Sequence, residues 1–240
     1  MDNSGPSQWL APTPSIDSAH PTIAATARRV AGCAHNDRER AQKLHDFVRD
    51  EIRFGWAAAF DRQTASEVLA SGIGFCNTKS TLLIALLRAI GIPARVHCVT
   101  INRRILRGLI RPPAEFVDHS YTEVLLENRW LGIDSYIVDA PLHRAAVARC
   151  RAEKLEIGYG VHPNGSINWD GRTDCFAQFA NDGTVPDLSD AVFGSFVDLE
   201  QFRATGLARN PSHLPSRLLI RWLTQAANRR VHALRSADGD

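Results

Sequence analysis

Cys76 lies where a thiol would be most reactive in this sequence. A glycine-rich turn, Ser71–Gly74, precedes it, and an almost continuous apolar segment follows it as far as Gly91. We therefore expect Cys76 in the first turn of a buried helix, with Lys79 one turn later adding positive charge. The first N–H groups of a helix lack partners within it, so they favour a thiolate and can stabilise the oxyanion that forms when it attacks a carbonyl carbon.

His119 is the candidate base for such a nucleophile. It begins a β-like segment after a long loop, and Glu127 and Asn128 further on are plausible residues for a tight hairpin turn. With that turn, His119 lies opposite Tyr136, and Asp134 shares the face of His119 because side chains alternate along a strand. The register therefore predicts that His119 and Asp134 are diagonal neighbours whose side chains can meet.

A set of helices and strands is expected to position these residues. Asn36 or Asp37 can cap a helix that continues to Ile52, and Thr64–Glu67 is a capping box for a second, short helix. After the helix of Cys76, three segments are rich in β-branched and aromatic residues: 94–102, 119–127 and 129–134. This order predicts an α+β fold in which the buried helix packs on an antiparallel sheet.

The segments on either side of this core are expected to differ from it. Residues 1–28 are expected to form a flexible N-terminal tail, and residues 29–140 the catalytic core. Residues 141–240 are expected to be a mainly helical C-terminal extension packed on the core, with helices over 145–155, 188–203 and 214–234. Loop 103–118 is long and apolar, so we expect it to be functional or mobile and able to cover an acyl chain.

The composition excludes several classes of protein. With 44% hydrophobic and 22% charged residues, the chain of 240 residues has enough apolar surface for a globular core. There is no apolar run long enough for a membrane span and no secretory signal, and the net charge of +2 gives no argument for nucleic acid binding. Five cysteines are an odd number that suits no disulfide framework, which indicates a reducing cytoplasm. The cysteines and histidines lack metal-ligand spacing, so we expect no metal and no other cofactor.

Three sequence blocks together resemble the transglutaminase-like superfamily over roughly residues 37–140. Gly74-Phe75-Cys76, the apolar helix and Gly91-Ile92-Pro93-Ala94-Arg95 together resemble the nucleophile block of this superfamily. His119–Val124 resembles its histidine strand, and Asn128–Asp134 resembles its aspartate strand. The resemblance implies a papain-like α+β core and a Cys76–His119–Asp134 triad. In that triad Cys76 is the nucleophile, His119 the general base and then acid, and Asp134 the group that orients His119. The resemblance also implies a second oxyanion donor upstream of the cysteine, for which Trp56 and Gln63 are candidates.

We therefore expect a cysteine-dependent enzyme that transfers the acyl group of a peptide, amide or thioester substrate, free or carrier-bound, through a thioester on Cys76. With water as the acceptor it would be a peptidase or amidase, which we place first because water is always present. With an amine or a carbon nucleophile it would be an acyltransferase or cyclase in small-molecule biosynthesis. An interpretation of another class is a non-catalytic protein-binding module that retains the fold. The triad alone does not select among the acceptors, and the oligomeric state does not follow from the sequence.

Overall fold

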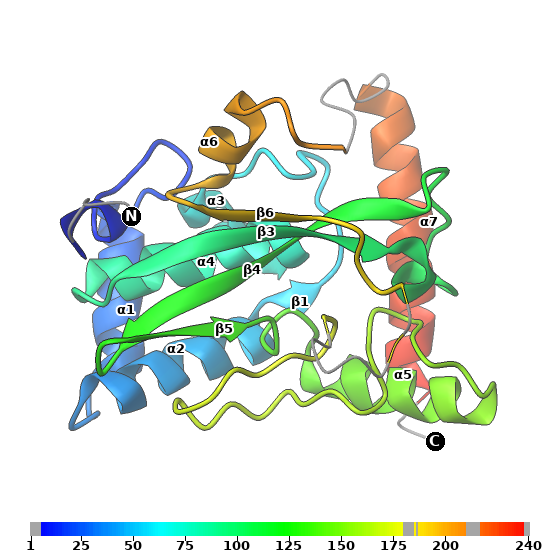
Figure 1. Ribbon diagram of the computed structural model, residues 1–240, viewed down its shortest axis with the longest axis horizontal. Helices are drawn as coiled ribbons and strands as arrows, with labels where there is room; N and C mark the ends of the chain where they lie inside the picture. The colour runs from blue at the N-terminus through cyan, green and yellow to red at the C-terminus, as the bar shows by residue number, and fades with distance from the viewer. Residues whose placement is uncertain (1–5, 180–184, 186, 210–216, 238–240) are drawn as a thin grey trace.

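A four-stranded antiparallel sheet with the strand order β5–β4–β3–β6 forms the centre of the protein (Figure 1). The computed structural model describes residues 6–179, 185, 187–209 and 217–237. The strands of the sheet are β3 (Ala94–Asn102), β4 (Phe116–Leu126), β5 (Arg129–Ile133) and β6 (Val192–Phe196). A separate parallel pair is formed by β1 (Arg53–Phe54) and β2 (Ile73–Gly74).

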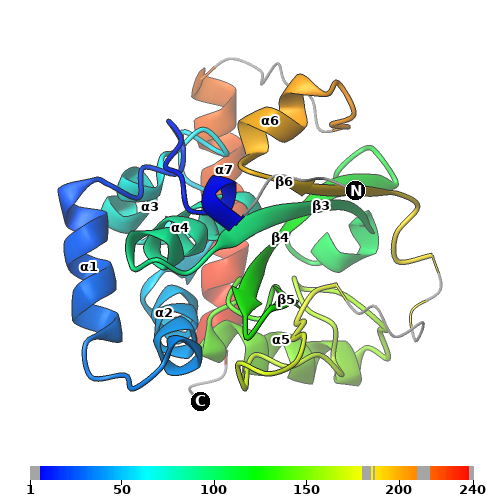
Figure 2. The same ribbon diagram turned by 60° about the vertical axis from the view of Figure 1, so that its left-hand side comes forward.

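Four helices gather on one side of this sheet (Figure 2). They are α1 (Pro21–Ala31), α2 (Asp37–Glu51), α3 (Ala65–Ser71) and α4 (Cys76–Ala89). Helix α4 is the central one, because it packs against β3 and β4 as well as against the other three helices. Its side chains from Leu82 to Leu87 are at most 1% exposed. The predicted α+β fold, with a buried helix on an antiparallel sheet, is confirmed.

The β4–β5 hairpin has the predicted register. Glu127 and Asn128 form its turn with φ values of 51° and 62°, so both residues adopt the left-handed conformation that such tight turns require. Thr122 pairs with Ile133 across the two strands. Asp134, which follows Ile133, therefore lies beside the part of β4 that contains His119.

The helix starts read from the sequence are also confirmed. Asn36 caps α2, and its side chain accepts a hydrogen bond from the N–H of Glu39. Thr64 and Glu67 form the predicted capping box of α3, and Gly72 ends that helix with a φ of 63°. These caps satisfy backbone groups that the helix ends would otherwise leave without partners.

The N-terminal segment is packed against the core, in contrast to the flexible tail expected over residues 1–28. From Pro6 onward it contains the 3-10 helix η1 (Pro6–Trp9) and then α1, which contacts α2 and α4. Ile16 and Ile23 are at most 1% exposed. Pro21 occupies the start of α1, where a missing N–H costs nothing, so this proline begins a helix instead of marking an unstructured tail.

The C-terminal extension adds a strand to the sheet as well as helices. It contains α5 (Ala140–Ala152), α6 (Leu199–Ala204), α7 (Arg217–Ser236) and β6, which pairs with β3. The single helix expected over residues 188–203 is wrong, since this region forms β6 and the short α6. Gly194 has a φ of 97°, which a helix does not allow, and Asp198 is extended and caps α6 through the N–H of Gln201. Helices α5 and α7 correspond to the other two expected helices.

None of the helices in the described part of the chain combines the length and the apolar character needed to cross a membrane.

Candidate active site

Cys76 is the first residue of α4 and is half-buried. The turn before it is tight: a Cβ atom on Gly74 would lie 2.8 Å from Oγ1 of Thr78 and 2.9 Å from Cγ of Lys79. The N-cap of α4 is Phe75, which makes no side-chain cap hydrogen bond. The first N–H groups of α4 are therefore not taken up by a capping side chain and can face a developing negative charge beside Cys76.

His119 lies between the side chains of Cys76 and Asp134. Its Nε2 is 3.3 Å from Oδ2 of Asp134, and Cys76 is near enough to raise the pKa of the ring. The Sγ of Cys76 itself lies 3.5 Å from Oδ1 of Asn77. Because Nε2 faces the carboxylate, Nδ1 is the ring nitrogen that remains for the thiol. The structure thus brings together the three residues that the sequence singled out.

The pKa of His119 reflects this position. Burial would lower it, since a charged ring is poorly solvated in the interior. The interactions with Asp134 and Cys76 outweigh that effect and raise the pKa of His119 from 6.5 to about 9. The imidazolium form of His119 is therefore stabilised at neutral pH.

Asp134 is fully buried and receives hydrogen bonds from three successive backbone N–H groups of the C-terminal extension. Ala177 and Gln178 donate to Oδ1 at 2.5 and 3.1 Å, and Phe179 donates to Oδ2 at 2.7 Å. The ring of Phe179 is stacked on that of His119, with 6.2 Å between ring centroids and 23° between planes. The sequence did not point to this segment, because hydrogen bonds from backbone N–H groups do not depend on the type of side chain.

A buried network of hydroxyl groups links α4 to β4 and to the loop after β5. The hydroxyl of Tyr136 lies 2.6 Å from Oγ of Ser80 and 2.8 Å from Oγ1 of Thr122. Nearer to Cys76, Ser120 donates to Oδ1 of Asn77 at 2.9 Å. The elements that carry the three site residues are thus joined by polar contacts in addition to apolar packing.

Lys79 points away from Cys76. Its Nζ donates to the backbone carbonyls of Ile137 and Arg49, at 2.9 and 3.4 Å, and the side chain is fully buried. Burial lowers the pKa of Lys79 from 10.5 to about 7, and Asp139 and Asp50 oppose this only in part. Lys79 was expected to add positive charge beside the thiol. Its contacts instead give it a structural role, which is to hold the loop after Asp134.

The two candidates for a second oxyanion donor differ in their surroundings. The ring of Trp56 packs against Phe75, the residue before Cys76, with 6.3 Å between centroids. The side-chain amide of Gln63 instead donates to Oγ of Ser71, and its Oε1 is buried without a partner. Trp56 is thus the candidate whose side chain packs beside the start of α4.

The remaining cysteines lack the surroundings of Cys76. Burial raises the pKa of Cys98, Cys150 and Cys175, in the case of Cys150 to about 11. Cys33 is exposed on the surface. Within the described residues, no group of three or more histidine, cysteine and acidic side chains could hold a metal ion.

Loop 103–118 is packed into the protein. Ile105 and Leu109 are at most 2% exposed, and the carbonyls of Ile105 and Arg107 accept hydrogen bonds from Gly160 and Tyr159. Two of the apolar side chains that could have covered an acyl chain are therefore buried in the fold, whereas Leu106 and Ile110 are half-buried. Part of the loop forms the 3-10 helix η2 (Arg103–Leu106), which shortens the irregular segment.

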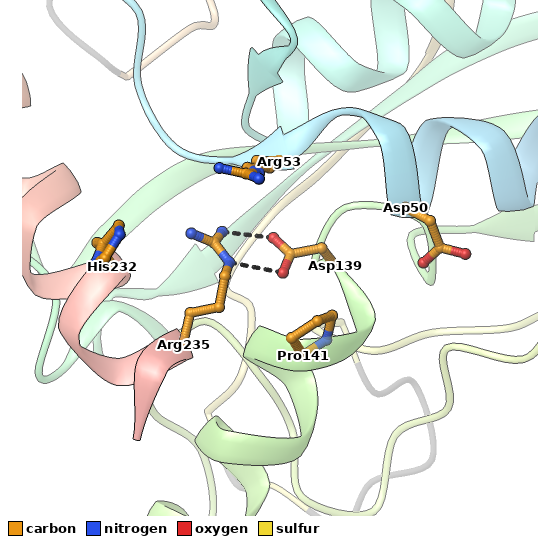
Figure 3. A pocket seen from close by; sticks show the side chains of 6 residues that line it. All are labelled: Asp50, Arg53, Asp139, Pro141, His232 and Arg235. Atoms are coloured by element: carbon orange, nitrogen blue, oxygen red, sulfur yellow. Dashed lines mark hydrogen bonds and ion pairs between the residues drawn. The ribbon is translucent and has the colours of Figure 1, made fainter. Parts of the chain in front are cut away.

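A pocket of about 330 Å³ lies apart from the triad, between β1, the start of α5 and the end of α7 (Figure 3). Arg235 of α7 forms two hydrogen bonds with the carboxylate of Asp139 here, at 2.9 and 2.6 Å. Asp139 also accepts hydrogen bonds from the N–H groups of Phe54 and Leu142. The ion pair between Arg235 and Asp139 therefore holds α7 against the loop that begins with Asp134. The pocket is lined by Asp50, Arg53, Asp139, Pro141, His232 and Arg235.

Residues 24–135 match the model of the transglutaminase-like superfamily. The matched segment begins within α1 and ends one residue after Asp134, so it contains all three site residues. It does not include Ala177–Phe179. No curated protein matches the sequence.

Two solved structures are similar at low sequence identity. One is described as a "Putative Cysteine Protease" from Cytophaga hutchinsonii; it is 20% identical with a TM-score of 0.45, and the similarity covers 55% of this chain and 42% of that one. The other is described as a "putative protease" from Parabacteroides distasonis; it is 16% identical with a TM-score of 0.36, covering 55% of this chain and 26% of that one. The similarity thus spans less than half the length of either protein.

Proposed function

We propose that the protein is a cysteine-dependent acyl-transfer enzyme that acts on an amide or thioester. The observation that carries the proposal is the position of His119, whose Nε2 faces Asp134 and whose ring is near enough to Cys76 for that residue to raise its pKa. A nucleophile, a base and a group that orients the base are what covalent catalysis by a thiol needs. A module that only binds a partner has no need of this arrangement.

The proposed reaction begins from a pair of charges in which His119 already holds the proton of the Cys76 thiol. The thiolate attacks the substrate carbonyl, and the first N–H groups of α4 stabilise the tetrahedral oxyanion. The intermediate collapses to a thioester on Cys76, while His119 donates its proton to the leaving amine or thiol. His119 then takes a proton from the acceptor, which attacks the thioester and releases the product. Asp134 orients the imidazole and stabilises its charged form throughout.

We infer that water is the acceptor, so that the enzyme is a peptidase or amidase. Water is always present as an acceptor, which favours this choice. The alternative, a synthetic acyltransferase or cyclase, was motivated by an apolar loop that could cover an acyl chain. Ile105 and Leu109 are buried in the fold, so these two side chains of the loop do not face a substrate.

Mass spectrometry of the intact protein after incubation with small amides and thioesters tests this function. We expect an acyl adduct on Cys76 that decays when water is the only acceptor and that is absent from Cys76→Ala. Cys33→Ala is the matched control, because it removes an exposed thiol outside the site, and it should form the adduct normally. An adduct that persists in Cys76→Ala, or no adduct with any donor, would reject the proposed reaction. Faster decay on addition of an amine, with formation of a new amide, would favour transfer over hydrolysis.

A further inference from the structure

We propose that Ala177–Phe179 are a clamp that positions the triad: their backbone N–H groups hold the carboxylate of Asp134, and the ring of Phe179 fixes the plane of the His119 imidazole. We call these residues the 177–179 clamp. The inference rests on the proposed function, because positioning has a catalytic consequence only if the triad reacts. The clamp belongs to the C-terminal extension, beyond the residues that match the superfamily model.

The carboxylate side of the clamp fixes both oxygens of Asp134. Oδ1 accepts two N–H groups and Oδ2 accepts one, and Oδ2 is also the atom that faces Nε2 of His119. With both oxygens engaged, the carboxylate cannot rotate without breaking hydrogen bonds in a fully buried site. Asp134 therefore presents Oδ2 to His119 in one orientation.

The imidazole side of the clamp is the ring of Phe179. It is stacked on His119 and also on Tyr121, with 5.9 Å between centroids in the second case. His119 is 3% exposed, so little of its ring meets water. A ring held between a carboxylate and an aromatic plane has one favourable orientation, and proton transfer to and from a thiol depends on that orientation.

A neighbouring loop supports the clamp from behind. The carbonyl of Ala177 accepts a hydrogen bond from His162 at 2.7 Å, and that of Phe176 accepts one from Ser166 at 2.9 Å. A Cβ atom on Gly165 would lie 2.8 Å from the carbonyl oxygen of Phe176 and 2.9 Å from Cα of Ala177. Gly165→Ala would therefore displace the clamp backbone without touching any residue of the triad.

The test measures how fast Cys76 is alkylated by iodoacetate and by iodoacetamide, from about pH 5 to pH 10, a range that spans the ordinary pKa of histidine. Iodoacetate is an anion, so it is attracted by the His119 imidazolium, whereas iodoacetamide is neutral. The ratio of the two rates therefore reports the charge on His119. Phe179→Leu and Gly165→Ala alter the clamp. Phe196→Leu is the control for loss of a ring that packs against Phe202 instead of the clamp, and Gly158→Ala is the control for a glycine whose Cβ would approach a side chain instead of the clamp backbone.

In both clamp variants we expect the preference for iodoacetate to disappear at a lower pH than in wild type, by at least about 0.5 pH unit. His119 has a raised pKa although burial opposes it, so the favourable contacts outweigh the burial penalty, and loosening the site moves the pKa toward 6.5. We also expect both variants to react about tenfold more slowly at neutral pH. The controls should match wild type.

If wild-type Cys76 reacts selectively but the clamp variants behave like the controls, the clamp is rejected and the proposed function stands. If wild-type Cys76 shows no selective reactivity, the proposed function itself fails. Amide hydrogen exchange provides a measurement that needs no change in the clamp. The amides of Ala177 and Phe179 should exchange slowly in wild type and rapidly in Asp134→Ala, and equal rates in the two proteins would overturn the clamp.

Discussion

Nε2 of His119 lies 3.3 Å from Oδ2 of Asp134, and neither side chain is more than 3% exposed. The two residues are 15 positions apart in the chain, and the tight hairpin between β4 and β5 brings them together. A carboxylate in so buried a site interacts strongly with an imidazolium, because little solvent screens the pair. This contact explains why His119 retains a proton at a pH where an ordinary histidine would have lost it.

The charge on His119 predicts the pH dependence of Cys76 alkylation. In wild type the iodoacetate-to-iodoacetamide rate ratio should be constant up to neutral pH and should fall through about pH 9, where the imidazolium loses its proton. The direction follows from the raised pKa, since the positive charge is present below it and absent above it. A ratio that instead falls through pH 6.5, the ordinary histidine value, would show that Asp134 and Cys76 do not hold the proton on His119.

Asp134→Asn should lower the rate of acyl transfer by about 10²- to 10⁴-fold, because a neutral amide can stabilise the wrong tautomer of His119 and cannot stabilise its charged form. The iodoacetate preference should disappear at a lower pH in the same variant. Asp118→Asn is the control: this carboxylate precedes His119 in the chain but accepts hydrogen bonds from the N–H of Arg209. A similar loss of activity in both variants would argue against a specific role for Asp134.

Tyr136→Phe should reduce the free energy of unfolding by about 1–3 kcal/mol, because it leaves the buried hydroxyls of Ser80 and Thr122 without their shared partner. Tyr159→Phe should cost less, since the hydroxyl of Tyr159 donates to the partly exposed Glu153. Denaturant unfolding of the two variants measures the difference. If Tyr136→Phe were as stable as wild type, the network between α4, β4 and the loop after β5 would not contribute to stability.

Lys79→Met should change the pH dependence of stability. The pKa of Lys79 is about 7 in the folded protein and near its ordinary value of 10.5 in the unfolded chain. Between these values the unfolded chain binds more protons, so this residue makes wild type more stable as the pH rises from 7 toward 10.5. The free energy of unfolding of wild type minus that of Lys79→Met should therefore increase over this window, by at most about 1.4 kcal/mol per pH unit. A difference that stays constant would mean that the buried amine keeps its proton.

The sequence was sufficient for the parts of the site that depend on local chemistry. The glycine-rich turn before Cys76 predicted a helix start, and the apolar residues after it predicted burial on all sides. The turn residues Glu127 and Asn128 predicted a register, and from that register the contact between His119 and Asp134 followed. Each of these inferences uses residues close together in the chain, where turn geometry and side-chain alternation determine the spacing.

The parts that depend on distant segments could not be predicted in the same way. Ala177–Phe179 bind Asp134 through backbone N–H groups, which every residue except proline has, so their side chains give no signal. The contacts of the Lys79 side chain could not be predicted either, because its partners are the backbone carbonyls of Ile137 and Arg49. Strand β6 was missed because it is short and half-buried, and because Gly194 interrupts its β pattern.

The most direct test of the central claim compares the alkylation rates of Cys76 and Cys33 by iodoacetamide near neutral pH, with each site quantified by peptide mass spectrometry. Cys33 is the more exposed thiol, so accessibility alone would make it the faster one. If His119 activates Cys76 as we propose, Cys76 should react at least about tenfold faster than Cys33, and this advantage should be lost in His119→Ala. If Cys33 reacts as fast as Cys76 in wild type, or if His119→Ala leaves the rate at Cys76 unchanged, the proposal that Cys76 is an activated nucleophile is contradicted.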